Sequence, residues 1–331
     1  MNFQQLRYVR EAIRRRFNLT DVANALYTSQ PGVSRHIREL EDELGVEIFE
    51  RQGKRLTGLT GPGAEIARIV DRLLLEADNL RRAGREFDGL VEGRIVLATT
   101  HTQARYALPS VITAFRREFP AVRLRLQQSS PEHIAQLLVD GEADVGIATE
   151  ALATYPELVA LPAYRWRHVV IGRRDHPLVR SRAASLAEVA ACPIVTYDAG
   201  FSGRGRIDEA FARNGLEVNV ALTALDADVI KTYVEAGLGL GIVAAMAFNP
   251  ERDRELARIE THEGFESSIT RVALRRGSYL RGYTYRFVEL LAPHLSREVV
   301  DAGLRGDIFG DASFDLPAYE AARSDLPRAA A

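Results

Sequence analysis

Apolar residues between positions 30 and 44 follow a helical rhythm. Val33, Ile37, Leu40 and Leu44 recur at steps of three and four residues, which is the spacing of one face of an α-helix. Ser29 is a suitable N-cap for this helix. A shorter helix is predicted over 19–26 and an amphipathic one over 3–13. The two helices over 19–26 and 30–44, joined by a tight turn, predict a helix-turn-helix. We expect the amphipathic helix over 3–13 to pack behind them.

The other face of the predicted helix over 30–44 is polar and basic, so its side chains can reach phosphates and base edges. The alternative is an ordinary amphipathic surface helix. Two short extended pieces around Gly53 then predict a hairpin, or wing, with three basic residues that could meet the DNA backbone or a minor groove. A solvated loop is the alternative there. The predicted DNA contacts are Thr28, Ser29, Gln30, Pro31, Ser34, Arg35, Arg38, Arg51, Lys54 and Arg55.

From position 62 to 87 the apolar spacing alternates between four and three residues, which is typical of a coiled-coil seam. The seam comprises Ile66, Val70, Leu73, Ala77, Leu80, Gly84 and Phe87. We expect this helix to pair with a second copy of the chain. The alternative is that it packs on its own domain. Two paired copies would present two recognition helices, which suits a two-fold symmetric DNA site.

Beyond Gly93 apolar strands alternate with helices. Strands are predicted over 95–98, 122–126 and 145–148, with helices over 106–119 and 132–139, which indicates a βαβαβ unit and a parallel sheet. A second such series follows, with strands over 169–171, 194–197, 218–220 and 241–244 and a helix over 226–236. Two α/β lobes with a cleft between them would bind a small molecule. The tail after about Gly303 carries no readable chemistry, and we expect it to be loosely held.

The candidate ligand-binding residues of the region beyond Gly93 lie where its first predicted strand ends and a helix begins. Ligands of open α/β sheets bind at such carboxyl ends, and a helix N-terminus offers free N–H groups. Thr100, Thr102 and Gln103 are neutral hydrogen-bonding groups suited to a small anion. The alternative is that the threonines merely cap the helix. Thr149 closes the third strand at the same edge, and the run 200–203 follows a strand of the second lobe, so both could face the same cleft.

Composition narrows the function classes. Residues 1–60 hold ten Lys and Arg against eight Asp and Glu, whereas the whole chain has a net charge of −2, so binding to DNA depends on where the charges lie. Cys192 is the only cysteine, and the seven histidines lack metal-ligand spacing, so neither a disulfide nor a metal or cofactor is expected. No nucleophile stands in a catalytic pattern, so an enzyme is not expected. No apolar signal or membrane span is present, and a cytoplasmic protein is predicted.

Taken together, these stretches resemble a LysR-type transcriptional regulator from end to end, and within that family the CysB-like subgroup of cysteine-regulon activators. The resemblance is carried by the runs 26–34, 40–45, 98–109, 147–152 and 226–234. It implies a winged helix-turn-helix at 1–60, a linker helix at 61–90, an effector domain resembling periplasmic binding proteins at 91–303, and a tail at 304–331. Lobe I would comprise about 91–164 plus 268–303, and lobe II about 165–267, with hinges near 164–167 and 265–270.

The same resemblance implies partners and site residues. It implies a homotetramer that binds double-stranded promoter DNA of sulfur-assimilation genes and contacts RNA polymerase. N-acetylserine or O-acetylserine would be the effector, with sulfate or thiosulfate opposing it. The anion site would use Thr100, Thr102, Gln103 and Thr149, with Trp166 nearby. Ser202 stands where the subgroup's best-known member has threonine, so it would hold the ligand less rigidly.

Three rival functions remain. A regulator of sulfonate or sulfate-ester use would share the same cleft motif, and the sequence does not separate it from a cysteine-regulon activator. A solute-binding protein would share the two lobes, but it would need a secretion signal and no helix-turn-helix. An enzyme would need a catalytic constellation.

Overall fold

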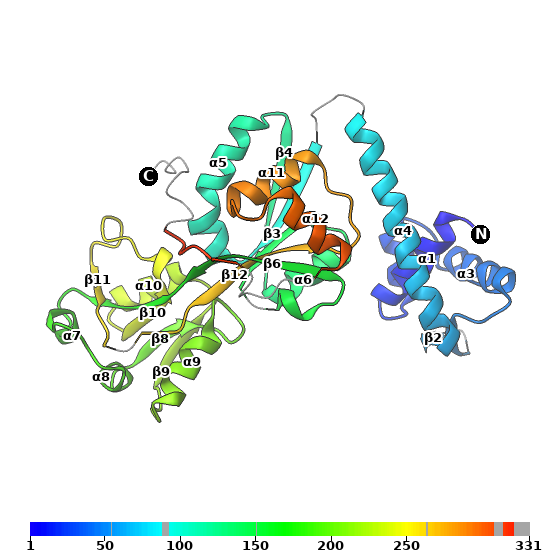
Figure 1. Cartoon of the computed structure of the whole chain (residues 1–331). Coiled ribbons are helices and arrows are strands. Elements are labelled where there is room, and N and C mark those ends of the chain that lie inside the picture. Colours follow the sequence, from blue (N-terminus) through cyan, green and yellow to red (C-terminus); the bar gives the residue numbers. More distant parts are fainter. Residues whose placement is uncertain (54, 88–92, 150, 263, 308–313, 321–331) are drawn as a thin grey trace. The chain divides into compact units, whose positions relative to one another are not determined.

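The computed structural model describes residues 1–53, 55–87, 93–149, 151–262, 264–307 and 314–320. It divides into two compact units, Met1–Gly89 and Leu90–Ala331 (Figure 1). None of the helices in these described ranges is both long and apolar enough to span a bilayer.

The first unit is a winged helix-turn-helix. Three helices come first, and an antiparallel hairpin, which pairs Phe49 with Leu59, precedes a long fourth helix. The helix over 30–44 forms as predicted, with Val33, Ile37 and Leu40 fully buried, although Leu44 at its end is exposed. The elements are α1 (Phe3–Arg14), α2 (Leu19–Ala25), α3 (Gln30–Leu44), β1 (Phe49–Gln52), β2 (Arg55–Leu59) and α4 (Gly61–Phe87).

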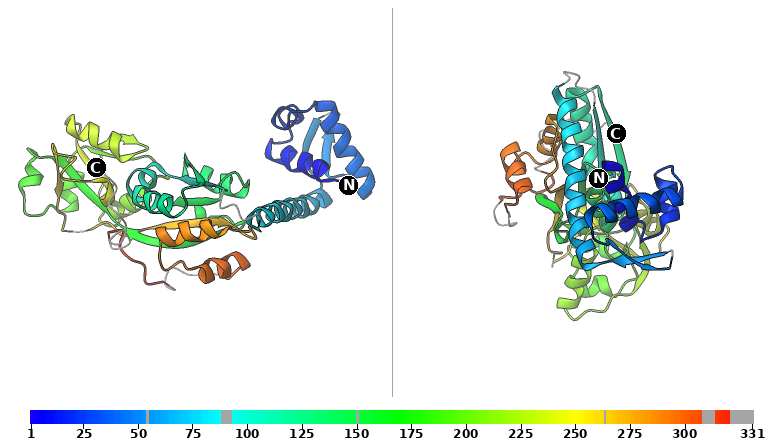
Figure 2. Two further views of the ribbon diagram at one scale, coloured as in Figure 1. Left: turned by 90° about the horizontal axis from the view of Figure 1, so that it is seen from above. Right: turned by 90° about the vertical axis from the view of Figure 1, so that its right-hand side faces the viewer.

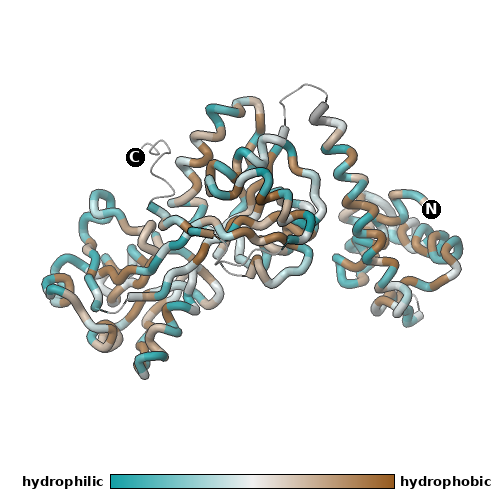
Figure 3. Tube along the Cα trace, in the orientation of Figure 1, coloured by the Kyte–Doolittle hydropathy of each residue, from teal (hydrophilic) through white to brown (hydrophobic). Residues whose placement is uncertain are grey.

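The apolar seam of helix α4 is partly buried in its own unit and partly exposed. Figure 2 shows it as one continuous helix beside the other helices of the first unit, and Figure 3 shows hydrophobic and hydrophilic residues alternating along it. Ile66 and Val70 pack into the core of their own unit, so the expectation that the whole seam faces a second copy is wrong there. Leu73 and Leu80, by contrast, are 40% and 76% exposed. The side chain of Phe87 lies outside the described residues.

Lobe I of the second unit is built on a five-stranded sheet in the order β4-β3-β5-β12-β6. Strands β4, β3 and β5 are parallel, as the βαβαβ pattern predicts. Strand β12, which returns from lobe II, runs antiparallel to β5 and β6. The elements are β3 (Gly93–Thr99), η1 (Gln103–Ala107), α5 (Leu108–Glu118), β4 (Val122–Gln128), α6 (Pro131–Val139), β5 (Val145–Ala148), η2 (Leu152–Thr154), β6 (Leu158–Trp166), β12 (Ser268–Arg275), α11 (Gly282–Leu291) and α12 (Arg297–Arg305).

Lobe II is built on a sheet in the order β11-β7-β10-β8-β9. Strands β10, β8 and β9 are parallel, whereas β7 and β11 are antiparallel to their neighbours, so the second predicted series is only partly a parallel sheet. Strand β9 starts at Val220, where the predicted strand was expected to end. The elements are β7 (His168–Arg173), α7 (Pro177–Arg180), α8 (Leu186–Ala190), β8 (Ile194–Tyr197), α9 (Arg204–Arg213), β9 (Val220–Ala224), α10 (Ala227–Glu235), β10 (Leu240–Ala244), η3 (Ala245–Ala247) and β11 (Leu256–Ile259).

The chain passes between the lobes twice, and part of the tail is fixed at one of these passages. Strand β6 ends at Trp166 and β7 starts at His168, while β12 begins at Ser268. Tyr319 donates its backbone N–H to the carbonyl of Arg165 (2.8 Å) and its hydroxyl to the carbonyl of Tyr106 (2.7 Å). Leu316 is buried. The expectation of a loosely held tail is therefore wrong for 314–320, because Pro317 and Tyr319 are both hydrogen-bonded to the backbone of Arg165 on β6.

Candidate DNA-binding and effector sites

Helix α3 presents its predicted DNA-contacting residues on its outer side. The hydroxyl of Ser29 accepts a hydrogen bond from the amide of Gly32 (3.3 Å), so Ser29 is the N-cap that the sequence predicts. The residues at the start of α3 and its two arginines are exposed, whereas Ser34 is half-buried. The exposed set is Thr28, Ser29, Gln30, Pro31, Arg35 and Arg38. These side chains are free of the core and accessible to a DNA groove.

A recess joins this helix to the wing. It has a volume of about 480 Å³, and Gln30 and Arg55 line it together with the start of α2. Arg16 lines the same recess and was not predicted, although it ends the run Arg14-Arg15-Arg16 at the C-terminal end of α1. The hydroxyl- and amide-bearing residues Asn18 and Thr20 complete the polar wall. This arrangement places two arginines, Arg16 and Arg55, at one hollow, which suits a phosphate.

Arg51 has a partner inside the protein. Its guanidinium donates to the Glu41 carboxylate, which also accepts the backbone N–H groups of Ile48 (2.8 Å) and Phe49 (3.1 Å). Glu41 is 5% exposed, so this cluster fixes the wing to α3. The structure therefore gives Arg51 a structural role, and its contact with DNA stays a prediction. Lys54 lies outside the described residues.

In the second unit, two predicted effector residues, Thr102 and Ser202, meet across the lobes near the end of β3. Thr100, Thr102 and Ser202 are all buried, and the hydroxyls of Thr102 and Ser202 are hydrogen-bonded across the lobes at 2.9 Å. Thr102 precedes η1, a short π-helical turn, and makes no side-chain capping bond to it. The alternative that this threonine merely caps a helix is therefore wrong for Thr102. π-helical turns are frequent at functional sites.

Gln103 and Trp166 meet at a residue that the sequence did not indicate. The Gln103 amide and the Trp166 indole N–H both donate to the hydroxyl of Thr270, at 3.0 and 3.1 Å. The Tyr164 hydroxyl donates to the other end of the Gln103 amide. Thr270 and Tyr164 lie on β12 and β6, the two strands that lead into the crossovers. Strand β12 also carries Ser268, Arg271 and Arg275, so no feature of the sequence sets Thr270 apart.

Thr149 lines a recess of its own. The recess has a volume of about 300 Å³ and lies between the end of β5, the start of α9 and the start of β12. We call it the α9 recess, and its walls are formed by Thr149, Gly203, Gly205, Arg206, Glu209, Ser267, Ser268, Ile269 and Arg271. Gly203 follows Ser202 directly, so the α9 recess adjoins the Thr102–Ser202 pair. Thr149 is half-buried.

A second inter-lobe contact surrounds Asp228 on α10. Tyr106 donates its hydroxyl to the carboxylate (2.7 Å), and Arg105 (3.4 Å) and Lys231 (3.3 Å) pair with it. Burial opposes ionisation of Asp228, but the Tyr106 hydrogen bond and the Lys231 charge outweigh this effect, and its pKa is lowered. Burial and the same hydrogen bond raise the pKa of Tyr106. This carboxylate joins the turn after β3 to lobe II.

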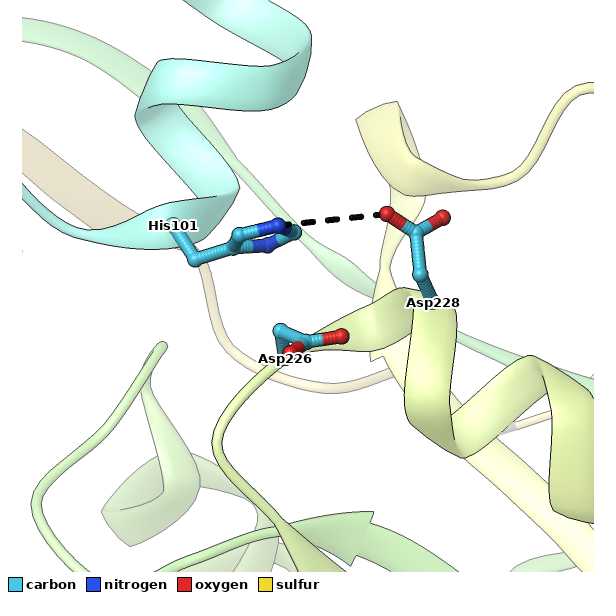
Figure 4. Close-up of side chains that lie close together, drawn as sticks. All are labelled: His101, Asp226 and Asp228. Atoms are coloured by element: carbon cyan, nitrogen blue, oxygen red, sulfur yellow. Dashed lines mark ion pairs between the residues drawn. The ribbon is translucent and has the colours of Figure 1, made fainter. Parts of the chain in front are cut away.

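His101, Asp226 and Asp228 come close enough together to be considered as metal ligands (Figure 4). The nearest His101 and Asp228 atoms are 4.0 Å apart, as the dashed line marks. Asp226 already accepts the amide of Val229 as the N-cap of α10 (2.9 Å), and Asp228 is neutralised by Arg105 and Lys231. This donor set therefore favours an inter-lobe ion pair over a bound cation.

Comparison with known proteins agrees with this architecture. The model of the LysR substrate binding domain matches residues 88–296, and that of the bacterial regulatory helix-turn-helix protein, lysR family, matches residues 3–64. The chain therefore belongs to the LysR family of transcriptional regulators, and it is a DNA-binding regulator with a small-molecule effector domain rather than an enzyme. The resemblance inferred from the sequence, including the CysB-like subgroup, is confirmed.

Three relatives give the scale of the similarity. The HTH-type transcriptional regulator SsuR of Burkholderia cenocepacia is 56% identical, over 92% of this chain and 99% of its own length. The regulator CysB of the same organism is 51% identical, over 93% and 98%. The crystal structure of the cofactor-binding domain of the Cbl transcriptional regulator is 46% identical with a TM-score of 0.63, and covers 65% of this chain and 95% of that one.

Proposed function

We propose that this LysR-type regulator controls promoters of sulfur-assimilation and cysteine-biosynthesis genes in the cytoplasm. In this proposal a small anion bound between the lobes switches it: N-acetylserine or O-acetylserine as inducer, with sulfate or thiosulfate opposing. The predicted DNA contacts around α3 and the wing read the promoter, and bound protein contacts RNA polymerase. The identities of 56% to SsuR and 51% to CysB support a regulon concerned with sulfur.

The observation that carries the effector proposal is the buried Thr102–Ser202 pair. Each hydroxyl can donate to an anion lodged between them, so a ligand would replace one direct 2.9 Å bond by two charge-assisted bonds. Thr100 is buried and lies two residues before Thr102 in the sequence. Gln103 is held in place by hydrogen bonds to Thr270 and Tyr164. Thr149 and the α9 recess provide adjoining space of about 300 Å³ for the rest of an acetylserine. Neutral donors can hold a small anion without a paired cation.

A ligand at this position would act on the lobes directly, because Thr102 belongs to lobe I and Ser202 to lobe II. Only a difference in affinity between two lobe arrangements can shift their populations. We propose that this shift reaches the DNA through α4, whose exposed Leu73 and Leu80 supply an apolar stripe for pairing with a second copy. Pairing of the effector domains would then complete a homotetramer.

A regulator of sulfonate or sulfate-ester use is the second candidate. The 56% identity to SsuR and the 46% identity to the Cbl domain lie close to the 51% identity to CysB, a spread too small to choose the regulon. Ser202 keeps the hydroxyl that would contact the ligand but lacks the methyl group of the threonine expected at this position. The ligand therefore has to be chosen by experiment.

The test is a titration of the full chain onto labelled promoter DNA from a cysteine-biosynthesis operon, followed by anisotropy and footprinting at two salt concentrations. We expect tight, salt-dependent binding and a footprint that changes with N-acetylserine. Binding without a response to N-acetylserine would transfer the proposal to the sulfonate-type regulon. Absence of specific binding would overturn the DNA-reading role of α3.

A matched pair of variants locates the effector. Thr102→Val removes the hydroxyl at constant shape, and we expect it to keep DNA binding but lose the response. Thr113→Val is the control, because the Thr113 hydroxyl only donates to the Pro109 carbonyl within α5 (2.8 Å). An unchanged response in Thr102→Val would remove this pair from the effector site.

A further inference from the structure

His168 is a buried polar residue to which neither the sequence nor the comparisons give a role. It begins β7, immediately after the first crossover, and is 5% exposed. The rings of Trp166, Tyr197 and Phe265 surround it, with centroids 4.9, 6.3 and 5.8 Å from its own. Its Nε2 lies 2.8 Å from the backbone carbonyl oxygen of Ser202.

The direction of this hydrogen bond is fixed. Burial lowers the pKa of His168 to about 4, so the imidazole is neutral near pH 7 and carries one N–H. A carbonyl oxygen can only accept, which places that hydrogen on Nε2. The Nδ1 atom is buried and has no hydrogen-bond partner in the part of the chain that the structure describes. The imidazole therefore has a single polar task here, which is to hold the Ser202 carbonyl.

The loop that His168 holds is conformationally demanding. Gly200, Ser202 and Gly203 all have positive φ, at +79°, +44° and +72°, and Ser202 pays a steric cost there that glycine would not. A Cβ on Gly203 would lie 2.6 Å from the Ser268 hydroxyl oxygen and 2.8 Å from Cε1 of His168. The backbone thus passes directly against the imidazole. Such a conformation persists only where surrounding contacts impose it.

We propose that His168 is a positioning residue that holds the 200–203 loop so that the Ser202 hydroxyl faces Thr102. This deepens the proposed function, because it makes a crossover residue set the geometry of the effector site. The carbonyl of Ser202 is fixed by His168 and its hydroxyl by Thr102, so the same residue is held from both ends. Loss of the first contact frees the hydroxyl to turn away from the ligand.

Two variants of His168 distinguish the effect of its hydrogen bond from the effect of its aromatic packing. His168→Phe keeps an aromatic ring among Trp166, Tyr197 and Phe265 but cannot donate, whereas His168→Gln can donate through its amide. The control is His294→Phe, because the half-buried His294 also bonds a backbone carbonyl, that of Pro162 (2.9 Å), without touching the 200–203 loop. All three are made in the full chain and titrated with sulfate and with N-acetylserine by calorimetry.

We expect effector affinity to fall roughly tenfold or more in His168→Phe, to stay within about threefold in His168→Gln, and to be unchanged in His294→Phe. Wild-type affinity in His168→Phe would overturn the inference. Equal losses in His168→Phe and His168→Gln would also overturn it, because packing alone would then explain them. If the wild-type chain binds neither compound, the proposed effector is wrong, and the inference is decided by the next measurement.

Hydrogen exchange needs no ligand. The amides of Phe201 and Arg204 bond the carbonyls of Asp198 and Phe201 within this loop, at 3.2 and 2.9 Å. We expect both to exchange at least tenfold faster in His168→Phe than in the wild type, with protection restored in His168→Gln. Unchanged exchange in His168→Phe would show that the loop holds its shape without this donor, and the inference would fail.

Discussion

The DNA-reading unit and the inter-lobe site are built over very different ranges of sequence. In the first, the Ser29 cap acts over three residues and Glu41 reaches the wing over seven to ten. In the second, the bonds Thr102–Ser202, Gln103–Thr270 and Trp166–Thr270 join residues 100, 167 and 104 positions apart. The first region can form from local chain, whereas the second exists only when both lobes and both crossovers are in place.

The largest expected effect tests the local region. Glu41→Ala leaves the Ile48 and Phe49 amides and the Arg51 guanidinium without their acceptor, and we expect it to destabilise the first unit by about 3 to 5 kcal/mol. The measurement is unfolding in urea, monitored both by circular dichroism and by the loss of DNA binding. Glu39→Ala is the control, since Glu39 pairs with exposed Arg35 and half-buried His36 on the surface of the same helix, and should cost less than about 0.5 kcal/mol. A small loss in Glu41→Ala would mean that the wing holds without its carboxylate.

The pH dependence of stability tests the inter-lobe site, through the buried side chain of His168. The unfolded chain protonates His168 below about pH 6.5, whereas the folded chain does so only near pH 4, because burial lowers this pKa. Unfolding therefore takes up a proton between these values, so stability is full above pH 6.5 and falls as pH drops, by about 3 kcal/mol in total. The measurement is urea unfolding of the second unit from pH 7 to 4. His168→Phe should lose this part of the pH dependence, and an identical pH dependence in both would contradict the buried neutral imidazole.

The smallest effect on stability concerns the exposed face of α3. Arg38→Ala should change the free energy of unfolding by less than about 0.5 kcal/mol, because Arg38 lies outside the core. If Arg38 meets a phosphate, the slope of log affinity against log salt should fall by about 1. Arg117→Ala removes the same charge from an exposed position on α5 and should leave the slope unchanged. Equal slopes for Arg38→Ala and the wild type would remove Arg38 from the interface.

The same contrast explains what the sequence could predict. Helix α3, its cap and its buried stripe follow from residues within one or two turns of each other, and so does the turn carrying Thr100, Thr102 and Gln103. The partners of that turn do not: Thr270 and Tyr164 look like ordinary strand residues until the crossovers bring them to Gln103. The role of Asp228 likewise depends on Tyr106, which lies 122 residues away.

Periodicity identifies a face but not its partner. The seam of α4 was correctly spaced, yet Ile66 and Val70 serve their own unit while Leu73 and Leu80 remain exposed. The segment 314–320 was missed for a related reason. Its few apolar residues, such as Leu316 and Tyr319, form no repeating pattern, and their burial depends on the edge of β6 and on Tyr106.

Trp166 is an intrinsic fluorescent probe of the inter-lobe crossover. It is the only tryptophan of the chain, it is buried at the first crossover, and its indole N–H is bonded to Thr270, which also holds Gln103. Any rearrangement of the lobes that disturbs this hydroxyl changes the polarity around a single emitter. The intrinsic emission spectrum therefore reports the state of the hinge in unlabelled protein, free or on DNA, with no second tryptophan to obscure it.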